Sequence, residues 1–528
     1  MEVQKANRFH QWKYPVVIGL MLTGLVFSKW LLSVSQFFLL FAVLSDKTSR
    51  KKLTEAFQSP LVLSLISIYV MHLAGMLWTS DMKYGFKDLQ NKLPMLALPV
   101  LFYAAGPLKK NTSIHLLLFF TFNVFLLSAV SLMNYYLSPE TTKHIVIGQS
   151  HIRFSLLICL SIIILIHFSD LKYKWYIYTI IPVIAFLLFF LFILESFTGY
   201  VVLVFLLFAL PLIYYDFIRK RKWRFILPLI MLAVFTLALT GFLNVKNSCF
   251  PKPKESNFST LPKQTINGNY YIHDTISLLS ENGYYMYINL SVPEMIPAWN
   301  NRSKLKIDES DSTSAERINI LTRYLTSKGL SKDSAGVMQL SKKDIKNIEQ
   351  GYSNYLLPDF DPYRKRIYRF LWELHYYNMT GDPSGHSLTQ RFEYWITAAS
   401  IIQQHPAFGC GTGDINNAFK QQYQKNNSKL KKEYRLRSHN QFLSITVALG
   451  FAGLLVFVFS LAAPFLFRKI PDYKLYLGFI FIFLLSLLNE DTLETQVGVT
   501  FYALFNSFLL FILPNKNKSE NEKARAEN

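Results

Sequence analysis

The sequence predicts an all-α polytopic membrane protein: a bundle of about 12 transmembrane helices with one large, mainly helical hydrophilic loop. Three observations lead to this class. Hydrophobic residues make up 51% of the 528 residues, with 45 Phe and 30 Tyr among them. These residues gather in long runs, which is typical of membrane spans rather than of several soluble domains. Lys and Arg gather between the runs, as they do in the cytoplasmic loops of membrane proteins.

Twelve apolar segments approach the length of about 20 residues with which a helix crosses a bilayer. They lie at residues 15–28, 30–44, 60–78, 93–106, 114–137, 152–169, 175–195, 198–217, 224–243, 440–467, 474–489 and 497–513. The first two are short, so either a tight hairpin or one bent helix would fit them. The chain after them keeps its charge pattern only if they count as two spans.

The basic residues predict an orientation with both chain ends in the cytoplasm. Each segment then placed inside carries an excess of Lys or Arg at its membrane boundary, as the positive-inside rule expects. These segments are the N-terminus, 45–59, 107–113, 170–174, 218–223, 468–474 and the tail from Lys516. The resulting division is 1–243 for a bundle of about nine spans, 244–438 for an outer cap, 439–513 for three spans and 514–528 for a cytoplasmic tail.

The cap is too long and too patterned to be a linker. Residues 314–328, 362–378 and 387–404 have helical periodicity, and the last of these helices is expected to end before Pro406. Ser341 followed by Asp344 has the pattern of a helix start. Two segments, Tyr270–Ile272 and Tyr284–Val292, alternate like strands.

Charge and cysteine content exclude several classes of protein. The net charge of +21 belongs to the membrane boundaries, and no basic segment accompanies a nucleic-acid binding module, so no nucleic-acid partner is expected. Cys249 and Cys410 would be able to form a disulfide if the cap faces an oxidising compartment, but the sequence favours two free thiols. No His or Cys cluster has the spacing of metal ligands, so neither a metal nor another cofactor is expected.

The stretch from Arg391 to Gly450 combines residues that suit an anionic substrate carrying a hydroxyl group. Arg391 and Trp395 lie on a helical segment that ends at His405-Pro406-x-x-Gly409-x-Gly411. After a basic linker, His439-Asn440-x-Phe442-Leu443 begins the next apolar run, which contains Gly450-x-x-Gly453. The glycines lack the strand and the Lys-Ser/Thr signature of a phosphate loop, so a turn that approaches the membrane closely is expected instead.

These residues, in this order, resemble the O-antigen ligase and O-antigen polymerase superfamily of membrane glycosyltransferases. The resemblance is clearest over residues 390–455 and extends more weakly to the number of helices around one late loop. It implies a GT-C-type fold in a bacterial inner membrane, with the large loop in the periplasm. It also implies a glycan donor linked to undecaprenyl diphosphate, which reaches the site from the bilayer.

The resemblance assigns roles to several residues. His439 is the expected base for the acceptor hydroxyl, because a neutral imidazole can accept a proton. Arg391 is expected to bind the diphosphate leaving group, because a guanidinium offers several donors in one plane. Arg153 is a second expected ligand, with His151 as a weaker neighbour. The alternatives without a catalytic role are an interfacial polar residue for His439, a solvated surface charge for Arg391 and a cation that reaches to lipid headgroups for Arg153.

The chain departs from the family at Glu195-Ser196-Phe197-Thr198-Gly199, where relatives often have Ser-Arg-x-Gly and this chain has Phe197 in place of the Arg. Another cation is expected to substitute, and Arg437 and Lys83 are the candidates. Asn440 and Trp395 are expected accessory residues. Glu490, Asp491 and Glu494 form an acidic turn that is either a solvated loop or a group that orients basic site residues. No facing carboxylate supports a glycosidase site.

The function implied is an O-antigen ligase-like transfer of a glycan to an acceptor hydroxyl, lipid A–core, with inversion and without a metal. An O-antigen or exopolysaccharide polymerase and a protein O-oligosaccharyltransferase remain open, because the acceptor is not encoded in these residues. A transporter or flippase for lipid-linked sugars is the alternative of a different class. Few charges within the spans and no internal repeat disfavour it.

Overall fold

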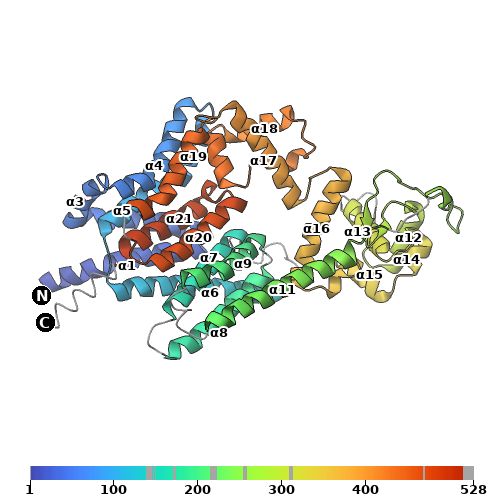
Figure 1. Ribbon diagram of the computed structural model, residues 1–528, viewed down its shortest axis with the longest axis horizontal. Coiled ribbons are helices and arrows are strands. Elements are labelled where there is room, and N and C mark those ends of the chain that lie inside the picture. The colour runs from blue at the N-terminus through green and yellow to red at the C-terminus, as the bar shows by residue number, and fades with distance from the viewer. Residues whose placement is uncertain are drawn as a thin grey trace. The chain divides into compact units, whose positions relative to one another are not determined.

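The computed structural model describes residues 2–137, 146, 148, 150–169, 174–194, 196–214, 223–253, 258–308, 313–467 and 470–514 (Figure 1). Helices dominate the described chain, and one two-stranded β pair accompanies them. The chain forms two compact units. Unit 1 comprises Met1–Leu227, Glu393–Ser428 and Arg435–Asn528, and unit 2 comprises Pro228–Phe392 and Lys429–Tyr434.

Unit 1 consists of helices from both ends of the chain. They are α1 (Glu2–Phe27), α2 (Lys29–Leu44), α3 (Lys47–Ala56), α4 (Pro60–Ala74), η1 (Gly75–Trp78), α5 (Met82–Ala105), α6 (Lys110–Leu137), α7 (His151–Phe168), α8 (Lys174–Ile193), α9 (Phe197–Ile213), α18 (Ile415–Lys425), α19 (Gln441–Phe467), α20 (Tyr473–Asn489), η5 (Thr492–Glu494), α21 (Gln496–Ser507) and η6 (Phe508–Ile512). Two helices pass between the units, α11 (Trp223–Cys249) and α17 (Ser387–Gln404).

The chain is a multi-pass membrane protein. Each predicted apolar segment falls on a helix, but among the described residues only five helices are long and apolar enough to cross a membrane by length and composition. The number is six if the bent pair α2–α3 counts as one span. The other apolar helices have 10–17 residues within the part of the chain that was searched, so the exact count of 12 stays a prediction.

The predicted loops of the orientation pattern lie largely outside the described residues. These are most of 138–149, then 170–173, 218–222, 468–469 and 515–528, with Glu195 and the side chain of Phe197 also outside. The positive-inside orientation and the division of the chain at residues 243 and 438 stay predictions.

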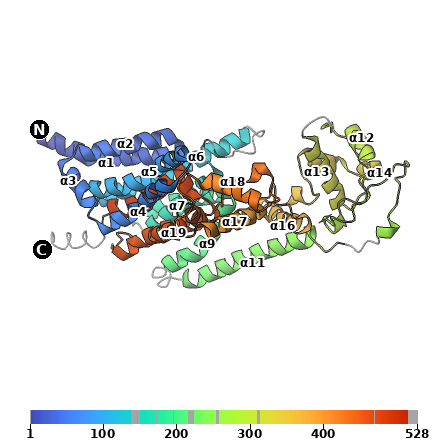
Figure 2. The same ribbon diagram turned by 90° about the horizontal axis from the view of Figure 1, so that it is seen from above.

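The first two apolar segments form a hairpin of two separate helices rather than one bent helix. Helix α1 ends at Phe27, and Ser28 caps α2 by accepting a hydrogen bond from Leu31 N. The two helices pack along one another (Figure 2). Gly24 makes this approach possible, because a Cβ at this position would lie 2.5 Å from Leu32 N.

The C-terminal helices are built into the N-terminal bundle. Helix α19 packs on α4, and α21 packs on α5, as the red and blue ribbons of Figure 1 show. Helix α20 packs on α7 and α9. The last three helices thus complete the core of unit 1, in which aromatic rings such as Phe483 and Tyr502 stack with their centroids 4.2 Å apart.

Helix α19 is broken at Gly450, where φ is 64° and the backbone is not helical. The segment 406–411 supplies hydrogen bonds at the break: Cys410 N donates to Val447 O at 2.9 Å, and Phe451 N donates to Pro406 O at 2.8 Å. Two further bonds join Gly411 N to Ala448 O and Ala452 N to Ala407 O. Non-helical backbone in a membrane span is tolerated where such partners satisfy its polar groups.

Two glycines let these backbones meet. A Cβ on Gly409 would lie 2.3 Å from the carbonyl carbon of Ala448, and a Cβ on Gly450 would lie 2.3 Å from that of Ala407. Both glycines also have a left-handed φ, which costs little without a Cβ. The glycine turn anticipated from the sequence is therefore a backbone clasp on α19, and we call residues 406–411 with 447–452 the glycine clasp.

Replacing Gly450 with Ala should destabilise unit 1. The new Cβ overlaps backbone atoms, which cannot rotate away as a side chain could, and it forces a strained φ. We expect Gly450→Ala to lower the unfolding temperature of the detergent-purified protein by several degrees. The control is Gly19→Ala in α1, where the added Cβ meets only side chains at 3.8 Å and beyond; equal unfolding temperatures for the two variants would contradict the clasp.

Unit 2 is a mainly helical domain with a short β pair. Its elements are η2 (Phe258–Thr260), β1 (Ser280–Glu281), β2 (Tyr284–Tyr285), α12 (Val292–Arg302), α13 (Ser314–Ser327), α14 (Ser334–Met338), α15 (Lys342–Glu349), η3 (Leu357–Asp359), α16 (Pro362–Thr380) and η4 (Lys432–Tyr434). One apolar core lies among α12, α13 and α15, and a second joins the end of α11 to α16.

The helices expected in unit 2 are present, and the strands are mostly not. Helices α13, α16 and α17 match the predicted segments, and Ser341 with Asp344 forms a complete capping box. The expected strands reduce to the β1–β2 pair and to isolated bridges such as Ile272 with Leu290. Alternation of apolar residues does not make a strand where no long partner strand lies beside it.

The three cysteines are free thiols. Cys249 lies in the last turn of α11 rather than in a hydrophilic loop, and it is buried. Its side chain packs within the second core of unit 2.

Candidate functional site

Two turns of unit 1 face each other and hold His439 between them. The first comprises residues 437–441, immediately before α19, and we call it the histidine turn. The second comprises residues 490–494, between α20 and α21, and we call it the acidic turn. The acidic turn is not a solvated loop, because its carboxylates accept hydrogen bonds from the histidine turn.

Asp491 binds the middle of the histidine turn. Its Oδ2 accepts from His439 N at 3.2 Å, and its Oδ1 accepts from Ser444 Oγ at 2.8 Å. His439 has a φ of 47°, a left-handed conformation that is uncommon outside glycine and requires support from its surroundings. The bond from Asp491 to the backbone of His439 supplies part of that support.

Glu494 binds both ends of the histidine turn. Its Oε2 accepts from Arg437 Nη1 at 2.8 Å, and its Oε1 accepts from Gln441 Nε2 at 3.1 Å. Gln441 in turn accepts from Leu493 N at 2.7 Å. His439 is thus flanked on either side by residues that hold the same carboxylate.

Glu494 also pairs with a buried lysine that sequence reasoning missed. Lys92 Nζ on α5 donates to Glu494 Oε2 at 3.1 Å and to Asp88 Oδ1 at 2.6 Å. The Lys92 side chain is 1% exposed. His72 on α4 completes this buried group, with Nδ1 at 3.7 Å from Asp88 Oδ2.

The available signal for Lys92 was its spacing from Asp88. Residues four apart lie on one face of a helix, and an Asp–Lys pair at that spacing just before an apolar run marks a charged face that a bundle can bury. The predicted span began at residue 93, which placed both charges outside it.

The charges around the acidic turn shift its carboxylates in opposite directions. Burial alone would raise the pKa of Glu494, but Lys92 and Arg437 outweigh it and hold the pKa well below its usual value. Burial, and then the negative charge of Glu494, raises the pKa of Asp491 above its usual value. Glu494 is therefore a firmly ionised carboxylate, whereas ionised Asp491 is disfavoured by its position.

The His439 ring lies beside Glu490 and Tyr394. Its Nδ1 is 3.5 Å from Glu490 Oε2, and the ring centroid is 5.6 Å from that of Tyr394. The side chain of His439 is 32% exposed, so the ring is held by neighbours while part of it remains open. Nδ1 faces a carboxylate, which leaves Nε2 as the nitrogen turned toward other partners.

Arg153 lies within electrostatic range of the same carboxylate. It lies in the first turn of α7, partly buried, and Glu490 acts on its guanidinium electrostatically. Glu490 therefore links His439 with Arg153, two residues that the sequence predicted for one site. His151 is the first residue of α7 and is exposed.

Two expected accessory residues anchor the histidine turn. Trp395 Nε1 on α17 donates to Ser438 O at 3.0 Å. Asn440 Nδ2 donates to Leu488 O at 3.1 Å, and its Oδ1 accepts from Leu443 N in the first turn of α19. Both contacts hold backbone rather than leave a side chain directed at a ligand.

Arg437 has several protein partners. Besides Glu494 it donates from Nε to Asn416 Oδ1 at 2.8 Å, and its guanidinium lies over the Tyr84 ring at 5.2 Å. These contacts give Arg437 a part in holding the histidine turn. Lys83, the other candidate for the cation absent at Phe197, is exposed in the first turn of α5.

Arg391 belongs to unit 2, on α17 one helical turn before Trp395. Its Nη1 donates to Ser387 O at 3.3 Å within that helix. The structure brings His439, Glu490, Arg153, Arg437, Glu494, Asn440 and Trp395 together in unit 1. It does not fix where Arg391 lies relative to them.

The glycine clasp positions this end of unit 1. Thr412, just after the clasp, donates from Oγ1 to His72 O at 2.6 Å, and Asp414 accepts from Ser80 N and Asp81 N. The same chain segment therefore binds the break in α19 and the end of α4. The histidine turn begins α19 nine residues before this break, so the clasp fixes the helix that carries the site.

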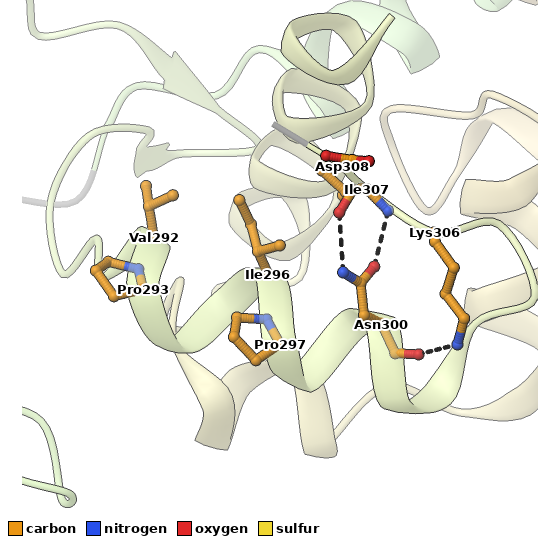
Figure 3. A pocket seen from close by; sticks show the side chains of 8 residues that line it. All are labelled: Val292, Pro293, Ile296, Pro297, Asn300, Lys306, Ile307 and Asp308. Atoms are coloured by element: carbon orange, nitrogen blue, oxygen red, sulfur yellow. Dashed lines mark hydrogen bonds between the residues drawn. The ribbon is translucent and has the colours of Figure 1, made fainter. Parts of the chain in front are cut away.

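Unit 2 has a shallow pocket of about 470 Å³. Its lining comes from α12 and the segment after it: Val292, Pro293, Ile296, Pro297, Asn300, Lys306, Ile307 and Asp308 (Figure 3). The Asn300 amide is used within the protein, since it donates to Ile307 O and accepts from Ile307 N. Lys306 Nζ donates to Asn300 O. These bonds leave the pocket without the convergent polar groups of a ligand site.

Replacing Glu494 with Gln should be strongly destabilising. The amide leaves Lys92 and Arg437 with one carboxylate fewer, and breaking a buried ion pair costs about 3–5 kcal/mol. Thermal unfolding of the detergent-purified protein would measure the loss. Glu55→Gln, at an exposed position of α3, is the matched control and should leave the unfolding temperature unchanged; a similar small effect in both would refute the role of Glu494.

Replacing Asp491 with Asn should stabilise the protein at neutral pH. A carboxyl group with a raised pKa in the folded state costs stability as the pH rises from its ordinary pKa of about 3.9 through the folded value. Asn removes this cost and can still accept from His439 N while donating to Ser444. We expect a higher unfolding temperature than wild type at pH 7.5 and a smaller difference at pH 4. Asp491→Ala, which loses both bonds, should unfold earlier than wild type at both pH values.

Residues 355–458 match the family model described as O-antigen ligase. The matched range contains Arg391, Trp395, the glycine turn and His439. No curated protein matches the chain. The resemblance predicted from the sequence is confirmed for this part of the chain, which is an O-antigen ligase family domain.

Proposed function

We propose, from the premise that residues 355–458 form an O-antigen ligase family domain, that the protein is a glycosyltransferase of the inner membrane. It moves a glycan from undecaprenyl diphosphate to a hydroxyl of lipid A–core at the periplasmic face, with inversion and without a metal. The general activity, glycan transfer of the O-antigen ligase or polymerase type, follows from the family match. The donor, the acceptor and the residues below are our assignment.

His439 is the base in this proposal. Its Nε2 accepts the proton of the acceptor hydroxyl as the oxygen attacks the anomeric carbon. Nδ1 faces Glu490 at 3.5 Å, so the carboxylate holds the ring in one orientation and stabilises the imidazolium that forms. This division of roles between a base and a carboxylate that orients it is common in enzymes.

The arginines bind the leaving group. As the anomeric bond to the diphosphate oxygen breaks, negative charge grows on undecaprenyl diphosphate, and the guanidinium groups of Arg391 and Arg153 neutralise it. Arg437 contributes positive charge to the same region while it holds the histidine turn. The polyprenyl tail remains in the bilayer throughout, which explains a site at the end of membrane helices.

One observation carries this proposal: the acidic turn binds His439 N and the side chains of Arg437 and Gln441 on either side of it, and it leaves the ring partly exposed beside Glu490. Buried carboxylates that fix a strained histidine would be a costly arrangement for a residue with a merely structural task. Trp395, on the helix of Arg391, binds the same turn.

The acceptor decides among three related activities, and the transfer assay separates them. Purified wild-type protein is incubated with undecaprenyl-diphosphate glycan and lipid A–core in the presence of EDTA. Product on lipid A–core supports a ligase. A lengthened lipid-linked glycan would indicate a polymerase, and glycan on protein Ser or Thr would indicate a protein O-oligosaccharyltransferase. Movement of the donor between leaflets without transfer would indicate a flippase.

Replacing His439 with Ala should lower the transfer rate by about 10²–10⁴-fold, the usual contribution of a general base. His115→Ala, at an exposed position of α6, is the control and should transfer at the wild-type rate. Both proteins must unfold at similar temperatures for the comparison to hold. Undiminished transfer by His439→Ala would remove the base assignment.

Replacing Arg391 with Ala should also lower the transfer rate, and Arg391→Lys should recover only part of it. A lysine keeps the charge but lacks the planar pair of donors that grips a diphosphate. Initial rates at saturating and limiting donor concentration distinguish loss of binding from loss of leaving-group stabilisation. Full activity of Arg391→Ala would contradict the assignment.

A further inference from the structure

Helix α11 changes character along its length. Residues Pro228–Cys249 form a candidate membrane span of which only 6% is buried, so its apolar side chains face outward. Large apolar residues continue to Leu243. Asn244, Lys246, Asn247 and Ser248 follow and are exposed. The apolar surface that a bilayer would cover therefore ends near Leu243.

Helix α16 begins beside the last apolar part of α11. Tyr363 OH donates to Ala238 O at 3.0 Å. The Tyr363 ring packs on Gly241, where a Cβ would lie 3.0 Å from the ring carbon Cε1. Ala238 lies five residues before Leu243, a distance of about 7.5 Å along the helix axis. Tyr363 is thus near the membrane boundary, where tyrosine is enriched.

The start of α16 is its membrane-proximal end. Further along the two helices, Val245 and Cys249 of α11 share a core with Tyr368 and Trp372 of α16. Both helices therefore rise away from the membrane boundary in the same direction. The N-terminus of α16, which carries a partial positive charge from the backbone amides, faces back toward the boundary.

Cations gather at this end. Arg364, Lys365 and Arg366 directly follow Tyr363, and Arg369 lies one turn later. Residues 359–369 hold these four cations and two carboxylates, Asp359 and Asp361, for a net charge of 4 − 2 = +2. Asp361 pairs with Arg364, and Asp359 pairs with Lys343 of α15. The formal charge of this segment is thus positive at the level where the exposed apolar surface of α11 ends.

We propose that residues 363–369 form an interfacial site that binds the phosphate groups of anionic phospholipids in the bilayer. Tyr363 marks the depth, and the cations with the N-terminus of α16 supply the attraction. A run of basic residues on an ordinary soluble helix would be a solvated face. Here it lies against a membrane span at the point where the apolar surface ends, and clusters of this kind attract anionic lipid. The site is independent of the proposed transferase reaction.

Native mass spectrometry of the full-length protein tests this site. The protein is presented in detergent with equal amounts of phosphatidylglycerol and phosphatidylcholine, and retained lipid is counted. The neutralised variant combines Arg364→Gln, Lys365→Gln and Arg366→Gln. It should retain at least about fivefold less phosphatidylglycerol than wild type, since each cation near a lipid surface contributes about that factor. Retained phosphatidylcholine should not change.

Two controls make the outcome decisive. Lys342→Gln with Lys346→Gln removes two exposed cations from α15 in the same unit and should leave phosphatidylglycerol retention at the wild-type level. Arg364→Lys with Arg366→Lys preserves the charge and should also retain the lipid, even if the neutralised variant folds poorly. Equal loss in the α15 variant, or wild-type retention in the neutralised variant, would overturn the proposal. Displacement by inorganic phosphate alone would indicate a free-phosphate site rather than a lipid site.

Discussion

The buried carboxylate of Glu494 is the interaction on which the arrangement of the site depends. It accepts from Lys92 of α5 and from Arg437 and Gln441 of the histidine turn. An isolated carboxylate or ammonium would be too costly to bury, so each of these charges requires the others. The ion pair joins Lys92 and Glu494, which lie 402 residues apart in the chain. The position of His439 therefore depends on helices from both ends of the chain.

The acidic turn and the glycine clasp divide the task of positioning. The acidic turn controls the local backbone of His439 through Asp491 and the ring through Glu490. The clasp controls the helix that follows, because hydrogen bonds from residues 406–411 replace those that α19 loses at Gly450. A base must be held to within a fraction of an ångström to act efficiently, and two independent supports on either side of one turn provide such control.

Much of this organisation could be predicted from the sequence. Hydrophobic run length gave the helices, and the order of Arg391, the glycine turn and His439 gave the region of the site. Lys92 was not predicted as a site residue, because a charge beside an apolar run is taken as the end of the span. In the structure it is buried and pairs with Glu494, which lies far along the chain. The expected strands around Tyr270 and Tyr284 are reduced to a short pair and isolated bridges for a related reason: alternation describes one segment, and a strand also requires a partner.

For the acidic turn the sequence left two alternatives open, a solvated loop and a group that orients basic site residues. Only the proximity of Lys92 and Arg437 turns Glu494 into a structural anchor. Hydrophobic run length gives the positions of the apolar helices but not how many of them cross the bilayer, because a full crossing needs about 20 apolar residues.

Gly409 and Gly450 impose one further consequence on how this sequence can vary. A Cβ at Gly409 would meet the backbone of Ala448, a Cβ at Gly450 would meet the backbone of Ala407, and backbone atoms cannot be made smaller by substitution. A change at one position therefore has no compensating change at its partner. Among related proteins, we expect both glycines to be kept together, or both to be lost together with the break in the helix.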